Sequence, residues 1–397
     1  MSTSEHRDVV VIGAGPAGSV AAERLASRGH DVVVLEEHDE IGAPVHCTGL
    51  LGFDAFEEFA LPQDLILGLA GTAKFWGAAG QSVSVHSDRV QAAVIDRAAL
   101  DRLLAARAAA AGATIRTGCR AETVDVGPTS VTVTGRGLAQ PLHARALVLA
   151  CGASYRFHRQ LGLGLPDVFL QSSQLETEFP EMPEVEVAFG RQVAPAGFAW
   201  LVPFKRGTTP YARIGLMCEE RSGERFDTFL RSLSVRAGVE RAPSGQPRQK
   251  MLPLGPIRRT YGDRVVAVGD AAGLVKPTTG GGIYYGLLSG TLAADVLAEA
   301  LGRDRLSDGH LRKYETRWRR RLGQEIRVGL AFRRIAARLS DESIDALIDL
   351  ARVNGVVPLL QETASFNWHR KAAIALLGHP SFRRIVFKSW VGSADPL

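Results

Sequence analysis

The stretch that decides the fold is DVVVIGAGPAG, Asp8 to Gly18, close to the start of the chain. Its first half is a run of β-branched residues, which favours a buried β-strand. Glycines follow at once, and residues 19–27 have the pattern of a helix. A strand, a tight glycine turn and a helix in this order are typical of a dinucleotide-binding unit, because the turn and the helix N-terminus face the phosphates.

Each small residue of this turn has a predicted role. We expect Gly13 to make the turn, Gly15 to let the backbone approach a pyrophosphate, and Gly18 to let the helix pack on the strand. Ala17 lies between the last two glycines and is assigned to the same cofactor site.

An acidic residue completes the fingerprint. Residues 31–35 form a second apolar strand, and Glu36 follows it, 23 residues after Gly13. A carboxylate here accepts hydrogen bonds from the adenosine ribose. Because no arginine follows Glu36 directly, the sequence favours NAD or FAD over NADP.

A second set of signals lies far downstream. Residues 264–268 read as a strand that ends in GDAAG, followed by KPTTGGGI at 276–283 and a helix over 284–301. We expect Asp270 to bind a ribityl hydroxyl and the following helix to point its positive end at the flavin ring. The cofactor contacts of the loop are assigned to Gly280, Gly281, Gly282 and Ile283. Together with the first fingerprint, this combination predicts FAD.

Glycine turn, Glu36 and Asp270 in this order resemble the FAD-binding fold of p-hydroxybenzoate hydroxylase and glutathione reductase relatives. Three stretches resemble the geranylgeranyl reductase family more narrowly: GAPVHCTG at 42–49, PAGFAWLVP at 195–203 and PTTGGGI at 277–283. The resemblance covers residues 8 to about 300. It implies that Cys47 and Thr48 lie beside the flavin, with Cys47 as the catalytic candidate.

The second of these stretches resembles the family's substrate-cavity motif, PxxYxWxFP. The resemblance assigns Phe198, Trp200 and Pro203 to the substrate site. Phe198 replaces the tyrosine of the motif and Val202 its second phenylalanine, so any role of a tyrosine hydroxyl is lost. Cys151 and Gly152 stand where aromatic hydroxylases usually carry Asp-Gly, which weakens a hydroxylase interpretation.

Several of these residues have ordinary explanations that the sequence leaves open. Arg97 matches an arginine that related flavoproteins place near the flavin or its phosphates, but it could equally be a surface residue at a helix start. Cys47 could be a buried free cysteine, and the aromatic residues could be core.

The predicted fold class is α/β, with a Rossmann-type FAD-binding domain, an antiparallel β-sheet substrate domain and a C-terminal helical region. Apolar runs at 72–86, 175–189, 198–204 and 211–218 supply the substrate sheet. The expected domains are a discontinuous FAD-binding domain over 1–70, 97–155 and 255–302, a substrate domain over 71–96 and 156–254, and a basic helical region over 303–397. The Pro- and Gly-rich segment 242–256 is expected to be a linker.

The net charge of +5 is a C-terminal feature, because residues 303–397 carry 18 Lys and Arg against 10 Asp and Glu. Basic and apolar residues alternate there at helical period, which could suit an anionic bilayer or a solvated helix packed on the protein. Arg319, Arg320 and Arg321 are the residues we expect at such a bilayer.

Composition excludes several other classes. With no run of eighteen apolar residues and no secretory signal, the chain is expected in the cytoplasm, with possible peripheral contact on the inner membrane face. The four cysteines are irregularly spaced, the histidines lack ligand spacing, and no nucleic-acid motif is present. We therefore expect no metal and no nucleic acid.

The resemblance implies an FAD-dependent oxidoreductase that saturates carbon–carbon double bonds of a geranylgeranyl-type isoprenoid chain on a lipid or diphosphate. Two alternatives stay open: a flavin monooxygenase or halogenase of the same fold, and a non-catalytic electron carrier or lipid-binding protein. The electron donor, NAD(P)H or ferredoxin, is unresolved because the sequence holds no second dinucleotide fingerprint. The proton donor, the number of bonds reduced and the oligomeric state are also open.

Overall fold

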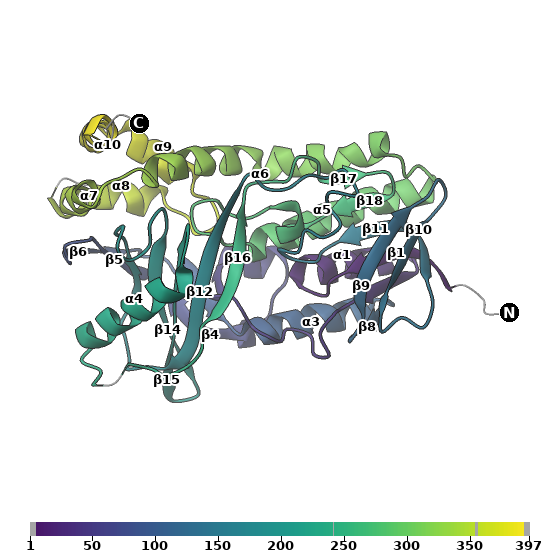
Figure 1. The fold of residues 1–397 in the computed structure, drawn as a ribbon, viewed down its shortest axis with the longest axis horizontal. Helices are drawn as coiled ribbons and strands as arrows, with labels where there is room; N and C mark the ends of the chain where they lie inside the picture. Colours follow the sequence, from purple (N-terminus) through teal and green to yellow (C-terminus); the bar gives the residue numbers. More distant parts are fainter. Residues whose placement is uncertain (1–4, 241, 354–355, 393–397) are drawn as a thin grey trace. The chain divides into compact units, whose positions relative to one another are not determined.

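The computed structural model describes residues 5–240, 242–353 and 356–392. It divides into two compact units, and each is built from three separate stretches of chain (Figure 1). The first unit comprises Met1–Val45, Arg97–Val168 and Pro253–Ile326, and the second comprises His46–Asp96, Phe169–Leu252 and Arg327–Leu397.

The first unit is built around a largely parallel sheet in the order β17-β18-β11-β1-β2-β8. Strand β1 (Glu5–Ile12) pairs in parallel with β2 (Val32–Leu35) on one side and β11 (Leu142–Leu149) on the other. The sheet continues through β8 (Thr114–Arg116), β18 (Val265–Ala267) and the antiparallel β17 (Tyr261–Gly262). Strands β9 (Arg120–Val126) and β10 (Val131–Arg136) extend it through β11. Because β1 has a parallel neighbour on each side, the sheet has a topological switch point between β1 and β11, where open α/β folds bind ligands.

Four longer helices belong wholly or partly to this unit: α1 (Pro16–Ala26), α3 (Arg97–Ala110), α5 (Ile283–Gly302) and α6 (Asp308–Ala336). Helices α1 and α5 are in close contact, since a Cβ added at Gly290 would lie 2.3 Å from the carbonyl oxygen of Ala17. The first half of α6 is anchored by the buried Trp318, whose indole donates to Thr260. Its basic side chains are partly neutralised here, because Arg317 pairs with Glu299 and Arg319 with Glu315.

The second unit contains a seven-stranded sheet in the order β16-β12-β15-β14-β13-β5-β6. Its strands are β5 (Thr72–Trp76), β6 (Ser82–His86), β12 (Val168–Glu178), β13 (Val185–Ala188), β14 (Phe198–Arg206), β15 (Thr209–Cys218) and β16 (Arg248–Leu254). A smaller sheet joins β3 (Leu50–Gly52), β7 (Ala92–Ile95) and β4 (Ile66–Ala70). Short helices α2 (Asp54–Glu58) and η1 (Gln63–Leu65) lie between β3 and β4 in the chain.

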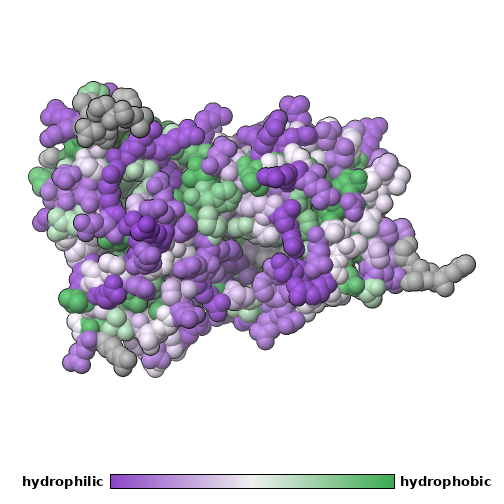
Figure 2. All heavy atoms as spheres, viewed as in Figure 1, coloured by the Kyte–Doolittle hydropathy of each residue, from purple (hydrophilic) through white to green (hydrophobic). Residues whose placement is uncertain are grey.

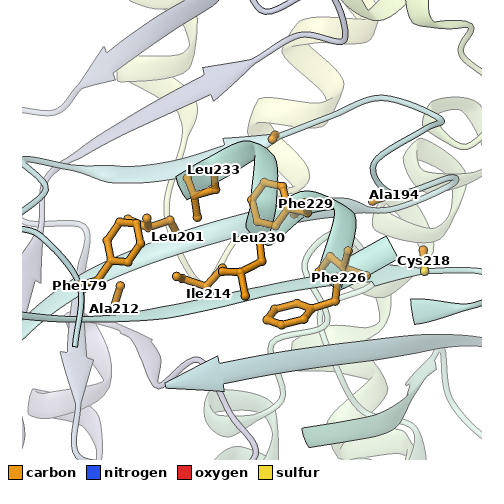
Figure 3. Packing of buried hydrophobic residues seen from close by; sticks show 13 residues of the cluster. Phe179, Ala194, Leu201, Ala212, Ile214, Cys218, Phe226, Phe229, Leu230 and Leu233 are labelled. Carbon is orange, nitrogen blue, oxygen red and sulfur yellow. The ribbon is translucent and has the colours of Figure 1, made fainter. Parts of the chain in front are cut away.

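Helix α4 (Ser222–Arg236) covers one face of the large sheet (Figure 3). Its Phe226, Phe229 and Leu233 pack with Leu201 and Ile214 in a buried cluster. Side chains alternate along a strand, so Ala199 and Leu201 face α4 whereas Phe198 and Trp200 face the opposite side of the sheet. This second face carries Phe198 and Trp200, two of the three residues that the sequence assigned to substrate. Pro203 is the register partner of Ala212 and lies on the α4 face instead.

The C-terminal part of the unit is helical, as the sequence predicted. Helices α7 (Asp341–Val353), α8 (Val356–Thr363), α9 (Arg370–Gly378) and α10 (Pro380–Gly392) follow α6. They pack through Leu350, Val356 and Phe382, with Phe332 of α6 stacked on Phe382. On the face seen in Figure 2, hydrophilic and hydrophobic side chains are interspersed.

The predicted α/β class is confirmed, and several details of the chain's division differ from expectation. Residues 156–168, expected in the substrate domain, belong to the first unit, and the region expected over 303–397 is divided between the units after Ile326. Residues 46–70 belong to the second unit instead of the cofactor domain, because β3 and β4 both pair with β7 there. The segment 242–256, expected to be a linker, contains β16, which pairs along the edge of the large sheet, a place where its proline is tolerated.

Candidate cofactor and substrate site

The cofactor residues of the first unit gather at one edge of its sheet. Because β1, β2, β11 and β18 run in parallel, their carboxyl ends meet at that edge. Gly13 follows β1, Glu36 follows β2, Cys151 comes just after β11, and Asp270 comes just after β18. Residues up to 257 positions apart in the chain therefore lie at one edge of the sheet.

The glycines of the first turn have the geometry that a phosphate site needs. Gly13 has φ of +105°, and a Cβ there would lie 2.4 Å from the Ala150 oxygen. A Cβ at Gly18 would lie 2.0 Å from the Gly13 oxygen, so only glycine lets α1 pack so closely. Around Gly15, by contrast, a Cβ would meet no protein atom within 4 Å. The space at the start of α1 is therefore open to a ligand.

Glu36 holds the glycine turn from the neighbouring strand. Its Oε2 accepts a hydrogen bond of 2.9 Å from the amide of Ala14, and its Oε1 accepts one of 3.1 Å from the amide of His38. These bonds fix the carboxylate beside the turn. A ribose hydroxyl can still donate to it, because each carboxylate oxygen accepts more than one hydrogen bond.

Asp270 lies on the short helix η2 (Gly269–Ala272), directly against the glycine run of the flavin loop. A Cβ added at Gly282 would stand 2.6 Å from its Oδ1. Two side chains that sequence analysis did not single out fix η2. The half-buried Tyr155 donates to the Asp270 carbonyl at 2.6 Å, and Nε2 of the buried His158 lies 2.6 Å from the Ala271 carbonyl. Burial raises the pKa of Tyr155 and lowers that of His158, so both rings are neutral near pH 7.

The loop at 276–282 is closed by its own backbone. The amide of Lys276 donates to Gly281 at 3.0 Å, and the amide of Gly280 donates back to Lys276 at 2.8 Å. The Lys276 side chain is only 4% exposed and lies close under Gly281. Helix α5 begins at Ile283 immediately afterwards, so its N-terminus follows the glycines directly.

Arg97 begins α3 and forms an ion pair with Asp101 at 2.8 Å. A Cβ at Gly42 would lie 2.9 Å from Cα of Ala98, so the loop after β2 packs on this helix start. Arg97 thus belongs to the same unit as the glycine turn, and its contact with the cofactor stays a prediction.

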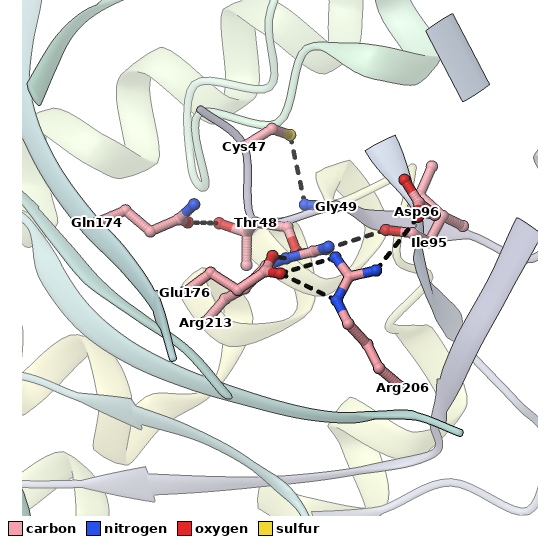
Figure 4. A network of polar contacts seen from close by, with 9 residues as sticks. All are labelled: Cys47, Thr48, Gly49, Ile95, Asp96, Gln174, Glu176, Arg206 and Arg213. Atoms are coloured by element: carbon pink, nitrogen blue, oxygen red, sulfur yellow. Dashed lines mark hydrogen bonds and ion pairs between the residues drawn. The ribbon is translucent and has the colours of Figure 1, made fainter. Parts of the chain in front are cut away.

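Cys47 and Thr48 lie in the second unit, on a segment that polar side chains hold in place (Figure 4). The Gly49 amide donates to the Cys47 sulfur at 3.3 Å, and the Thr48 hydroxyl donates to Gln174 at 3.0 Å. Arg213, only 1% exposed, donates to the carbonyls of Thr48 at 2.8 Å and Ile95 at 3.0 Å. Sequence analysis missed Arg213.

A carboxylate compensates this buried arginine. Glu176 accepts from Arg213 at 2.8 Å and from Arg206 at 2.7 Å. Burial alone raises the pKa of Glu176, but the hydrogen bonds from Arg206 and Arg213 outweigh it and hold the pKa below its usual value. The charge of Arg213 is therefore paired, as a buried charge must be.

The strand register places the Thr48 segment and Trp200 on the same face of the large sheet. Gln174 of β12 pairs with Gly215 of β15, and Gly215 pairs with Trp200 of β14. Residues directly opposite in such pairs project to the same side. Thr48 is bonded to Gln174, so the predicted catalytic segment and the predicted substrate wall share one face.

The wall itself is aromatic. Phe198 contacts Trp200 edge-on with ring centroids 5.8 Å apart, and Phe189 lies 6.1 Å from Phe198 on the other side. Trp200 is 8% exposed and its indole nitrogen has no hydrogen-bond partner in the described structure. Pro203 is partly buried on the same strand. Both residues that depart from the family motif, Phe198 and Val202, keep this face apolar.

Cys151 stands at the carboxyl end of β11, and its thiol donates to the Ser154 carbonyl at 3.2 Å. Desolvation raises the pKa of this thiol to about 11, so it stays protonated at neutral pH. Within residues 5–240, 242–353 and 356–392, no cluster of His, Cys, Asp and Glu could hold a metal ion.

The first unit fits FAD on its own geometry. The open space before Gly15, the acid beside the turn and the second acid against the glycine loop match the needs of a pyrophosphate, a ribose and a ribityl chain. Residues 6–327 match the family model described as FAD binding domain, so the protein is an FAD-binding flavoprotein.

Relatives narrow the class. The chain is 33% identical over 353 residues to digeranylgeranylglycerophospholipid reductase 2 of Methanothermobacter thermautotrophicus, covering 86% of this chain and 90% of the relative. It is 30% identical over 354 residues to the digeranylgeranylglycerophospholipid reductase of Methanocaldococcus jannaschii, with the same two coverages. The chain belongs to the geranylgeranyl reductase family of FAD-dependent oxidoreductases.

Solved structures share the fold. A geranylgeranyl bacteriochlorophyll reductase-like protein from Thermoplasma acidophilum superposes with a TM-score of 0.84 at 24% identity, covering 98% of this chain and all of that one. A mutant of the halogenase PltM in complex with FAD gives a TM-score of 0.69 at 17% identity, covering 98% of this chain and 93% of its own. Among the described residues, no helix has the length and apolar character needed to cross a membrane.

Proposed function

We propose that this protein saturates carbon–carbon double bonds of an isoprenoid chain carried by a lipid or a diphosphate. One observation supports the proposal most directly: the Cys47–Thr48 segment and the aromatic wall at Phe198 and Trp200 share one face of a single sheet. The names of the relatives, which act on digeranylgeranylglycerophospholipid, agree with a substrate of this class.

The cofactor residues divide the work of holding FAD. Gly13, Gly15, Ala17 and Gly18 receive the pyrophosphate at the start of α1, and Glu36 binds the adenosine ribose. Asp270 would hold the ribityl chain, and residues 280–283 would contact the ring. Bound and reduced, FAD supplies the hydride for one alkene carbon. Arg97 is a further candidate for the phosphates.

The second unit positions the substrate. An isoprenoid chain offers almost no hydrogen-bonding groups, so Phe198 and Trp200 orient it by contact area. A dry apolar wall also excludes water from the reacting bond. Cys47 either donates the proton for the second alkene carbon or shapes the space around it, and Arg213 positions Cys47 through Thr48.

The experiment compares Cys47→Ala with Cys119→Ala, the replacement of a buried cysteine whose thiol donates to the Gly137 carbonyl. Both variants are reduced and given a geranylgeranyl lipid in detergent, and the double bonds that remain are counted by mass spectrometry. We expect Cys47→Ala to keep its FAD but to slow reduction by roughly 100-fold, the contribution typical of a positioned acid, or to change the product pattern. If turnover and products were unchanged, Cys47 would have no part in the reaction and would only fill space in the fold.

Oxygen uptake separates this function from a monooxygenase or halogenase of the same fold. The reduced protein with a prenyl lipid should consume no more oxygen than free reduced flavin, and alkene content should fall. A protein that is bleached on reduction yet changes no alkene would be an electron carrier or a lipid-binding protein instead.

The same proposal implies further partners. An external donor must reduce the flavin, and the donor can be identified by supplying NADH, NADPH or reduced ferredoxin separately. A prenyl lipid resides in a membrane, so we also propose peripheral contact with an anionic bilayer at the cytoplasmic face. The excess of basic residues over 303–397 supports this contact.

A further inference from the structure

A groove lies among the helices at the C-terminal end of the second unit. It has a volume of about 670 Å³ and is formed by the end of α6, by α9 and by α10. This volume is within the range of pockets that hold small molecules. The lining combines two kinds of residue, four arginines and a set of apolar side chains.

The arginines are Arg334 near the end of α6, Arg338 in the turn that follows, and Arg383 and Arg384 of α10, and all four are exposed. Among the residues that the structure describes, no carboxylate forms an ion pair with any of them. The arginines of the first half of α6 differ in this respect, because Arg317 pairs with Glu299 and Arg319 pairs with Glu315.

Acidic residues on the neighbouring helix α7 are engaged elsewhere. Asp341 accepts from the amide of Arg191, and Asp345 accepts from the amide of Ala79. Asp349 lies 3.8 Å from Arg352, and Glu342 is held by Ser340 and its own amide. The positive charge of the groove is therefore not neutralised from this side.

The apolar lining is the second observation. Ile335, Leu339, Leu377, Val386 and Phe387 contribute to the groove, and Phe387 is 65% exposed. A ring so exposed beside unpaired guanidinium groups is typical of a surface that enters the headgroup region of a bilayer, where basic groups meet phosphates and apolar groups meet the first methylenes.

We propose that this groove is a docking site for the phosphate-bearing end of an anionic phospholipid in a bilayer. Guanidinium groups bind phosphate in a bidentate fork, and the apolar residues take the adjoining part of the chain. The proposal rests on the proposed function in that a membrane lipid is its substrate. It moves the membrane contact from Arg319–Arg321 to the groove between α6 and α10.

The test uses the full-length, FAD-loaded protein and sedimentation with vesicles. Vesicles of phosphatidylglycerol mixed with phosphatidylcholine are compared with vesicles of phosphatidylcholine alone. The groove variant carries Arg334→Gln, Arg383→Gln and Arg384→Gln. A control variant with the same loss of charge carries Arg312→Gln, Arg319→Gln and Arg320→Gln, all on the first half of α6.

We expect the wild type and the control to sediment with the anionic vesicles and the groove variant to bind them on the order of 100-fold more weakly, since each basic residue near such a surface contributes about fivefold. Phe387→Ser should also weaken binding. Equal losses in the groove and control variants would overturn the proposal, because overall charge would then explain binding.

Two further results would also overturn it: a wild-type protein that ignores anionic vesicles at low salt, and release from the vesicles by millimolar inorganic phosphate, which would show a site for free phosphate. Circular dichroism and flavin content confirm that each variant is folded. Binding is measured without turnover, so reduction of a detergent-dissolved lipid tests the proposed function separately.

Discussion

Among single residues, Asp270 gives the most direct test of the proposed FAD site. Its carboxylate lies against Gly282, and its backbone carbonyl accepts a hydrogen bond from Tyr155. Because that bond does not involve the carboxylate, we expect the loop to keep its conformation when the Asp270 side chain is removed. Asp270→Ala should weaken FAD binding roughly ten- to hundredfold, the loss expected for one hydrogen bond to a charged group. Titration of the apoprotein with FAD, followed by flavin fluorescence, measures this.

Asp304→Ala serves as the control for this variant, because Asp304 is an exposed acid that pairs with Arg145. It should bind FAD as the wild type does. If both variants bound FAD equally well, Asp270 would have no place in the cofactor site.

His158 gives a pH dependence whose sign can be worked out. Burial lowers its pKa below the unfolded value of 6.5, and its Nδ1 is buried without a partner. Because the folded protein binds this proton less readily than the unfolded chain, stability is complete above pH 6.5 and falls as pH drops below it. The loss is at most about 1.4 kcal/mol per pH unit for one histidine.

Urea unfolding between pH 7.5 and 5.5 measures this loss. A His158→Gln variant, which can still donate to the Ala271 carbonyl, should lose less stability over the same interval. The control is His143→Gln, which replaces a half-buried histidine of β11 that is hydrogen-bonded to Thr132. It should keep the acid sensitivity of the wild type. A His158→Gln variant with the acid sensitivity of the wild type would contradict this account.

At the scale of elements, strand β15 controls the aromatic wall through one glycine. A Cβ at Gly215 would lie 2.6 Å from the Trp200 ring and 2.9 Å from the Ser173 carbonyl, so the ring must move. Gly215→Ala should cost roughly 1–3 kcal/mol of stability, as overpacking does. It should also shift the indole fluorescence and change how many double bonds are reduced, with FAD content unchanged.

Gly309→Ala is the matched control, since a Cβ there would meet no atom within 4 Å. A Gly215→Ala variant that kept the wild-type fluorescence and products would mean that Trp200 does not form the wall. The two substitutions add the same methyl group, so any difference between them reports on the space around Gly215.

The elements also show which features a sequence can predict. The turn at Gly13–Gly18 is local, so strand, glycines and helix specify it together within a few residues. Arg213 is different. Its partners Thr48 and Ile95 lie 165 and 118 residues away in the chain, and an isolated arginine on a strand carries no signal of such partners. The same holds for Tyr155 and His158, whose role depends on η2, more than 110 residues downstream.

At the scale of the whole molecule, chain connectivity limits prediction in the same way. Residues 46–70 follow the first fingerprint directly, so sequence order assigned them to the cofactor domain, yet strand pairing places them in the second unit. The split puts Cys47 and Thr48 in one unit and the glycine turn, Glu36 and Asp270 in the other. A sequence motif can therefore assign a role to residues without indicating which unit carries them.

Because FAD binds the folded protein and the unfolded chain lacks its site, FAD should stabilise the folded protein by mass action. Free FAD at 100 times its Kd adds about 2.7 kcal/mol, which corresponds to a rise in Tm of roughly 3 °C for a chain of this length. FMN lacks the adenosine that Glu36 and the glycine turn would bind, so it should give a much smaller rise at the same concentration. Thermal unfolding of the apoprotein with graded FAD or FMN measures both effects. Equal rises in Tm with FAD and FMN would show that residues 13–36 contribute nothing to flavin binding. No rise in Tm with either flavin would contradict the assignment of this edge of the first unit's sheet to a flavin.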